Sequence, residues 1–94
     1  MNYRVLVLPE AERDLIRLGE FVGEVSPDLS DRVRNLLVKA MKSLERRPER
    51  GRRLPRREER QLLVPFGSVG YVIHYRLAGD EVTISRIFHT REDR

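Results

Sequence analysis

The chain has 94 residues, 39% of them hydrophobic, with no cysteine and a formal net charge of +4. This length supports one compact core, so we expect a single domain over residues 1–94. The lack of cysteine excludes disulfide frameworks and thiolate metal sites, and His74 and His89 alone do not form a metal-ligand pattern. We therefore expect neither a metal nor another cofactor.

The distribution of apolar residues indicates a protein outside the membrane. No run approaches the roughly 20 apolar residues that span a bilayer. The apolar part of the opening segment MNYRVLVLPE is too short for a secretory signal. We expect a cytoplasmic protein.

The positive charge is concentrated in one segment. Residues 46–60 contain eight arginines and three glutamates, a net charge of +5, whereas the rest of the chain has a net charge of −1. Such a segment creates a local field that attracts an acidic protein segment or a nucleic acid.

The first elements are a strand and a helix. Residues 3–8 (YRVLVL) are mostly apolar and typical of a strand that ends at Pro9. A proline in the first turn, acidic residues after it and apolar residues at helical spacing predict a helix over residues 9–24. Gly19 within it indicates a close approach to another element.

A second helix follows a short turn. Ser26 is placed to cap it and Pro27 to occupy its first position, and a continuous apolar stripe extends the helix to Arg47. Two antiparallel helices cannot bury both of their stripes against each other alone. A sheet must cover the remainder.

The second half of the chain predicts a surface loop and three strands. Residues 48–59 form the loop, residues 60–65 a strand, residues 66–68 a turn and residues 71–89 a β-hairpin. The order is β-α-α-β-β-β, with the first strand parallel to the last. The predicted fold is α+β, with two antiparallel helices packed on a mainly antiparallel four-stranded sheet.

The hairpin register follows from its turn. A two-residue type II′ turn at Gly79-Asp80 predicts the following opposed pairs on one face: Leu77 with Val82, Tyr75 with Ile84, Ile73 with Arg86, and Tyr71 with Phe88. The other face is half apolar, which indicates a hairpin inside a sheet.

Arg86 then lies on a mainly apolar face, where an unpaired charge is costly. Either it pairs with a carboxylate such as Asp14, or that face opens to a cleft.

The chain resembles the ParE branch of the RelE/ParE toxin superfamily over nearly its full length. The matching motifs, in order, are YRVLVLPEAERDL, LERRPERGRRLP, GYVIHYRL and VTISRIFHTRED. The resemblance implies a small toxin paired with a ParD-like antitoxin of the ribbon-helix-helix type. It also implies a target, since ParE members poison DNA gyrase and RelE members cut mRNA on the ribosome.

The resemblance favours the gyrase branch. RelE-like members have an arginine where this chain has Val72, and lysines in the preceding strand where it has Arg60 and Leu62. They also have a tyrosine or second basic group near the C-terminus, whereas no tyrosine follows Tyr75. We therefore expect a gyrase-binding toxin without catalytic residues of its own.

An mRNA endonuclease stays open as an alternative. RNA cleavage needs a base, an acid and cations around the phosphate. His89 and Arg91 fall where some RNase members carry catalytic groups, and Arg60 completes the alternative set. The same His-x-Arg ending occurs in ParE members, and His89 also suits a structural role at a strand end. A third alternative is a non-toxic, partner-binding member of the fold.

We predict that arginines of the basic segment and the hairpin bind the partner. These residues are Arg50, Arg52, Arg53, Arg56, Arg57, Arg60, Arg76 and Arg86. The alternative for the segment is a solvated loop. Direct DNA binding would need a recognition element such as a helix-turn-helix. Any exposed remainder of the helix stripes would suit an antitoxin helix and strand that fold on binding.

Overall fold

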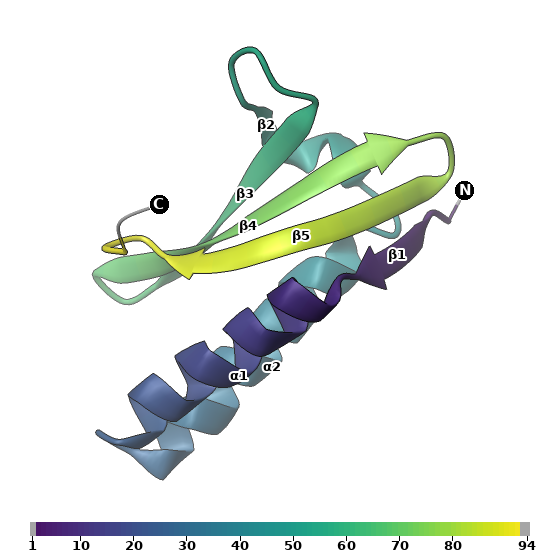
Figure 1. Cartoon of the computed structure of the whole chain (residues 1–94). Helices are drawn as coiled ribbons and strands as arrows, with labels where there is room; N and C mark the ends of the chain where they lie inside the picture. The colour runs from purple at the N-terminus through teal and green to yellow at the C-terminus, as the bar shows by residue number, and fades with distance from the viewer. Residues whose placement is uncertain (1, 93–94) are drawn as a thin grey trace.

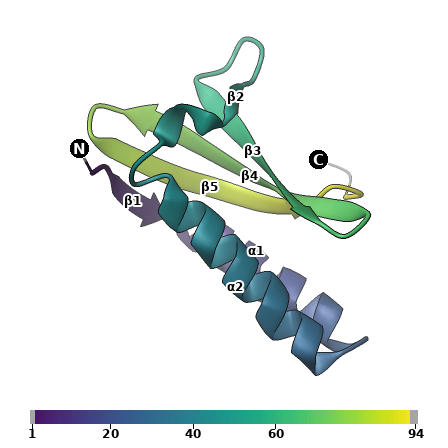
Figure 2. The same ribbon diagram turned by 180° about the vertical axis from the view of Figure 1, so that it is seen from behind.

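A five-stranded sheet in the order β1-β5-β4-β3-β2 carries two helices, α1 and α2, on one face (Figures 1 and 2). The computed structural model describes residues 2–92. The elements are β1 (Arg4–Val7), α1 (Pro9–Gly23), α2 (Pro27–Ser43), the 3-10 turn η1 (Pro48–Arg50), β2 (Arg52–Arg53), β3 (Glu59–Phe66), β4 (Val69–Ala78) and β5 (Glu81–His89). β1 is parallel to β5 and all other neighbours are antiparallel, which confirms the predicted α+β architecture.

The predicted strand count was one too low. Residues 48–59 contain η1 and the short strand β2 in place of an unstructured loop. β2 pairs Arg52 with Gln61 and Arg53 with Arg60. The sequence of two arginines lacks the alternation of apolar and polar residues that predicts a strand. The two residues are extended because they pair with the edge of β3.

The helices start as predicted and end earlier. Pro9 and Pro27 open α1 and α2, but Ser26 at the N-cap position makes no side-chain capping bond, and α2 ends at Ser43 rather than Arg47. A Cβ atom added to Gly19 would lie 3.4 Å from Ser30 Oγ, which confirms the predicted close approach. Glycine therefore lets α1 and α2 pack tightly at this point.

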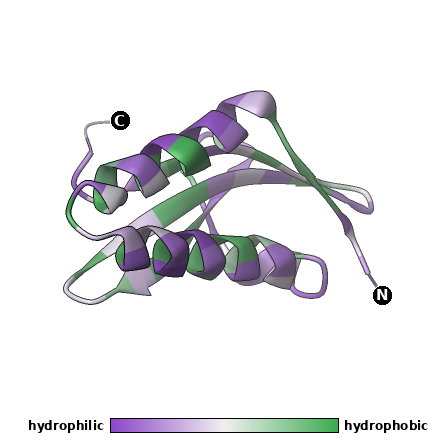
Figure 3. Cartoon of the chain, turned by 90° about the horizontal axis from the view of Figure 1, so that it is seen from below, coloured by the Kyte–Doolittle hydropathy of each residue, from purple (hydrophilic) through white to green (hydrophobic). Residues whose placement is uncertain are grey.

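The core lies between the helix pair and one face of the sheet. Both helices alternate hydrophobic and hydrophilic residues along their length (Figure 3), as amphipathic helices do. Leu18 of α1 and Leu37 of α2 are buried against Ile73, Tyr75 and Ile84 of the sheet. The opposite face has no helix over it (Figure 1), and we call it the open face.

A β-bulge changes the hairpin register. Leu77 pairs with Val82 and Tyr75 with Ile84, as predicted, but beyond them Ser85 has no opposite residue. The remaining pairs are His74 with Arg86, Ile73 with Ile87, Val72 with Phe88, and Tyr71 with His89. The predicted pairs of Ile73 with Arg86 and of Tyr71 with Phe88 are therefore wrong. One extra residue moves every later side chain to the other face.

The hairpin lies inside the sheet, as predicted. β4 is flanked by β3 and β5, and β5 by β4 and β1. Across residues 2–92, neither helix combines the length and the apolar character needed to cross a membrane.

Candidate functional site

Asp14 of α1 is the most connected buried charge in the described part of the chain. Asp14 is 4% exposed, and its carboxylate accepts bonds from Arg86 Nε at 2.7 Å and from Ile87 N–H at 2.9 Å. Arg86 Nη2 adds a bond of 3.2 Å and Arg17 Nη2 one of 3.3 Å. Of the two alternatives left open for Arg86, a carboxylate partner such as Asp14 or a cleft, the structure shows the pair with Asp14. The premise was wrong, because Arg86 lies beside His74 on the open face and not on the mainly apolar face.

The position of Asp14 follows from the short first strand. β1 pairs with β5 only up to Ile84, and α1 then packs along the rest of β5. The carboxylate thus replaces a neighbouring strand as the acceptor for Ile87 N–H. Burial raises the pKa of Asp14, but the bonds from Arg86, Ile87 N–H and Arg17 outweigh burial and hold the pKa below its ordinary value.

Arg17 connects this network to the end of β5. Its guanidinium binds Glu92, which also accepts His89 N–H at 3.0 Å. The hydrogen bond to Glu92 raises the pKa of Arg17 above its ordinary value. Arg17 and Glu92 therefore link the turn after β5 to α1.

His89 and Arg91 line a groove of about 590 Å³ between α1 and the end of β5, which we call the α1–β5 groove. Its lining residues are Arg17, Leu18, Phe21, Val22, Val69, Tyr71, His89, Arg91 and Glu92. The His89 ring meets Tyr71 edge-on at 5.3 Å, and His89 Nδ1 accepts Arg91 N–H at 3.1 Å. His89 thus makes a backbone bond of the kind that a structural role at a strand end involves, and this role stays a prediction. Burial raises the pKa of Tyr71.

Arg60 lies apart from His89 and Arg91. Arg60 pairs with Tyr75 of β4, whereas His89 pairs with Tyr71 of the same strand. Tyr71 and Tyr75 are four positions apart, which corresponds to about 13 Å along a strand. Arg60 Nη1 donates to Gly51 O at 2.9 Å and to Glu49 O at 3.4 Å. The structure does not gather the three residues into one site.

Val72 and Leu62, the positions that separated the two toxin branches, lie on opposite faces of the sheet. Val72 pairs with Leu63 on the open face, and Leu62 pairs with Ile73 in the core. Both are buried. A single phosphate-binding site could not include both positions, so only Val72 bears on the chemistry of the open face.

A hollow of about 390 Å³ on the open face is lined by Leu54, Arg57, Glu59, Gln61, His74, Arg86 and Phe88. The Arg86 guanidinium carbon lies 4.8 Å from the centre of the Phe88 ring, and Arg57 lies 3.9 Å from Glu59. Both arginines of the hollow are thus already paired with carboxylates. This arrangement lowers their availability for a phosphate group.

The profile of a family described as "ParE toxin of type II toxin-antitoxin system, parDE" matches residues 5–94. The chain belongs to this ParE toxin family. It is 40% identical over 94 residues to Toxin RelE1 of Caulobacter vibrioides (strain ATCC 19089 / CIP 103742 / CB 15), covering all of both chains. It is 37% identical over 86 residues to Toxin RelE3 of the same strain, covering 92% of each.

A solved structure shows that the fold is shared. A chain of "Chromosomal ParDE TA system from P. aeruginosa" superposes on this ParE-family toxin with a TM-score of 0.79. The sequence identity is 20%, with 95% of this chain and 97% of the other covered. The chain is thus the toxin component of a type II toxin-antitoxin system.

In this toxin, the predicted partner-binding arginines fall into two groups. Six side chains are exposed, namely Arg50, Arg52, Arg53, Arg56, Arg57 and Arg76. Arg60 and Arg86 are half-buried. Arg60 donates to backbone oxygens, and Arg86 donates to Asp14. Sequence reasoning missed Phe21 and Val69 of the groove, because only the folded chain brings these two residues together.

Proposed function

We propose that this toxin acts by binding DNA gyrase, without catalysing a reaction, and that a ParD-like antitoxin of the ribbon-helix-helix type neutralises it. The main support is Val72, which is 1% exposed between its cross-strand partners Leu63 and Phe88, at a position where RNase members carry an arginine. A buried valine can neither donate a hydrogen bond nor carry charge. Gyrase acts on DNA in the cytoplasm, so the proposal places the toxin there.

A supercoiling and cleavage assay with purified gyrase tests this mechanism. Micromolar toxin should inhibit supercoiling and increase the amount of cleaved DNA, and added antitoxin should reverse both effects. Boiled toxin serves as the control. Unchanged supercoiling at micromolar toxin would refute the gyrase mechanism.

The second candidate is a ribosome-dependent mRNA endonuclease. It is favoured by the contact between His89 and Arg91 in one groove. Translating ribosomes with added toxin provide the test: our proposal predicts no new mRNA ends. Toxin-dependent cuts that disappear with His89→Ala would favour the endonuclease instead. Unimpaired growth on induction without antitoxin would indicate a non-toxic, partner-binding member.

We predict that the exposed arginines after η1 bind a partner. Reversing Arg52, Arg53, Arg56 and Arg57 to glutamate should weaken binding of antitoxin or gyrase by roughly tenfold or more, because complementary charge guides association. The free energy of unfolding should change by only about 0.5 kcal/mol per site, as is usual for exposed positions. Titration and urea denaturation measure the two quantities.

The matched control reverses four other exposed cations, Arg4, Arg13, Arg34 and Lys42. It changes the net charge equally but leaves the segment around β2 intact. Equal binding by the loop variant and the unmodified toxin would show that the segment is a solvated loop.

A further inference from the structure

An apolar stripe on α1 extends from the core into solvent. Leu18, Phe21 and Val22 are spaced as neighbours on one face of α1, and Val25 continues this spacing in the turn after Gly23. Leu18 is buried, whereas Phe21 is 69% and Val25 79% exposed. In Figures 1 and 2 the helix pair diverges from the sheet towards this end. The sheet therefore no longer covers the apolar stripe where the helix pair and the sheet separate.

Two grooves open into this divergence. The α1–β5 groove has Phe21 and Val22 on one wall and Tyr71 on the other. A second groove, of about 780 Å³, lies between α2 and the β3–β4 turn and includes Leu36 and Phe66. Val69 lines both grooves, so we treat them as two sides of one wedge.

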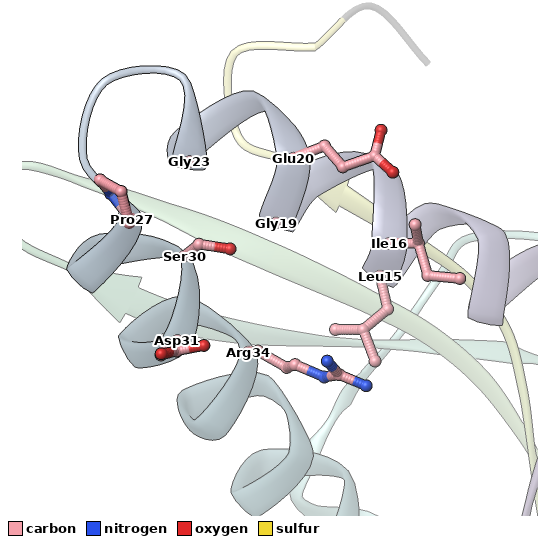
Figure 4. Close-up of a pocket in the computed structure, with 9 residues that line it drawn as sticks. All are labelled: Leu15, Ile16, Gly19, Glu20, Gly23, Pro27, Ser30, Asp31 and Arg34. Atoms are coloured by element: carbon pink, nitrogen blue, oxygen red, sulfur yellow. The ribbon is translucent and has the colours of Figure 1, made fainter.

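The charge of the wedge favours an acidic occupant. The charged residues of its described lining are Arg17, Arg32, Lys39, Arg91 and Glu92. The outer groove between the two helices differs, since Glu20, Asp31 and Arg34 line it (Figure 4). A segment with apolar side chains and carboxylates therefore fits the wedge and not the outer groove.

Glu92 is the one carboxylate in that described lining, and it is bound to Arg17. The two side chains are 29% and 47% exposed, and a pair so open to water adds little stability. A carboxylate from outside can therefore replace Glu92 on Arg17 at small cost.

We propose that Glu92 is an internal competitor for an acidic amphipathic segment of the antitoxin, which binds in the wedge. The apolar side chains of that segment pack against Phe21 and Tyr71, one carboxylate pairs with Arg91, and another displaces Glu92 from Arg17. An amphipathic helix in an apolar groove is a recurring mode of peptide recognition. This inference rests on the proposed neutralisation by an antitoxin.

Titration of the toxin with the purified ParD-like antitoxin tests this proposal. Phe21→Ser should weaken binding roughly tenfold, as expected for a central apolar contact. The matched control is Ile16→Ser, which removes a 58% exposed side chain of the same helix in the outer groove and should change binding little. Equal losses for the two variants would overturn the proposal.

The charge exchange is tested by Glu92→Gln. This change releases Arg17 while the amide oxygen can still accept His89 N–H, so binding should tighten by roughly threefold to tenfold. Glu20→Gln makes the same change of net charge in the outer groove and is the control. Binding by Glu92→Gln no tighter than by Glu20→Gln would overturn the competitor role. Circular dichroism checks that all variants are folded.

A second probe separates this inference from the proposed function. Anilinonaphthalene sulfonate combines an apolar ring system with an anion, as the wedge requires. Its fluorescence with the toxin should fall for Phe21→Ser, rise for Glu92→Gln, and stay constant for Ile16→Ser and Glu20→Gln. If the antitoxin fails to bind the unmodified toxin, the proposed neutralisation is refuted. The dye then tests separately whether the wedge binds an apolar anion. Equal fluorescence in all variants would overturn the proposal that the wedge is a binding site.

Discussion

Replacing Asp14 by alanine lowers the free energy of unfolding by about 3 kcal/mol at neutral pH, the low end for breaking a buried ion pair. The change removes the acceptor of Ile87 N–H, a buried donor that no other group replaces. It also removes the partner of Arg86, whose side chain is 42% exposed and regains water in the variant. Urea denaturation measures the loss.

The matched variant is Asp14→Asn. Its amide oxygen can still accept Ile87 N–H, so the loss should be smaller, about 1–2 kcal/mol. Asp31→Asn, on the exposed face of α2, removes a charge without a buried partner and should cost little.

The contribution of Asp14 should depend on pH. The pKa of Asp14 in the folded state lies below its ordinary value, so its stabilising effect is fully present above about pH 4, the ordinary pKa in the unfolded chain. It is lost as pH falls through the lower pKa of the folded state. The gap in unfolding free energy between unmodified toxin and Asp14→Ala should therefore narrow below about pH 4. A gap that stays constant down to the acid limit of folding would contradict this.

Replacing Tyr75 by phenylalanine should cost about 2–3 kcal/mol, because two buried groups lose their partner. The Tyr75 hydroxyl donates to Pro48 O at 2.6 Å and accepts Gly51 N–H at 2.8 Å. Burial raises the pKa of Tyr75. Amide hydrogen exchange at Gly51 should accelerate, and the segment before β2 should loosen. Tyr3→Phe is the control, since the Tyr3 hydroxyl makes no bond to the described residues.

Gly51→Ala tests the same contact from the other side. An added Cβ would lie 2.3 Å from the Tyr75 hydroxyl oxygen and 2.7 Å from a ring carbon, so we expect a loss of about 1–3 kcal/mol. Because both changes act on one contact, the losses of Tyr75→Phe and Gly51→Ala should not add in the double variant. Strictly additive losses would show that the contact does not hold this segment.

The sequence predicted most of the fold and part of the candidate site. Proline positions and apolar periodicity located α1 and α2, and the Gly79-Asp80 turn set the first pairs of the hairpin. The cost of an unpaired charge left two alternatives for Arg86, and the bond to Asp14 is one of them. These inferences succeeded because each depends on local chemistry or on a simple energetic requirement.

The misses concern features that no local pattern encodes. Ser85 has the same strand propensity whether or not it has an opposite residue, so the sequence does not reveal the bulge, and the predicted register puts Arg86 on the wrong face. The two arginines of β2 became a strand only beside β3. Leu62 and Val72 were compared as parts of one site, although pairing places them on opposite faces.

The sequence by itself therefore determined the two helices, the main strands, the basic segment and the toxin family, because periodicity, turn chemistry and motif order are properties of neighbouring residues. Only the tertiary structure decided that Arg17 and Glu92 meet, that Arg60 lies apart from His89, and that Phe21 faces a groove. These relations join residues far apart in the chain. They depend on how the helix pair diverges from a sheet whose register changes at one extra residue.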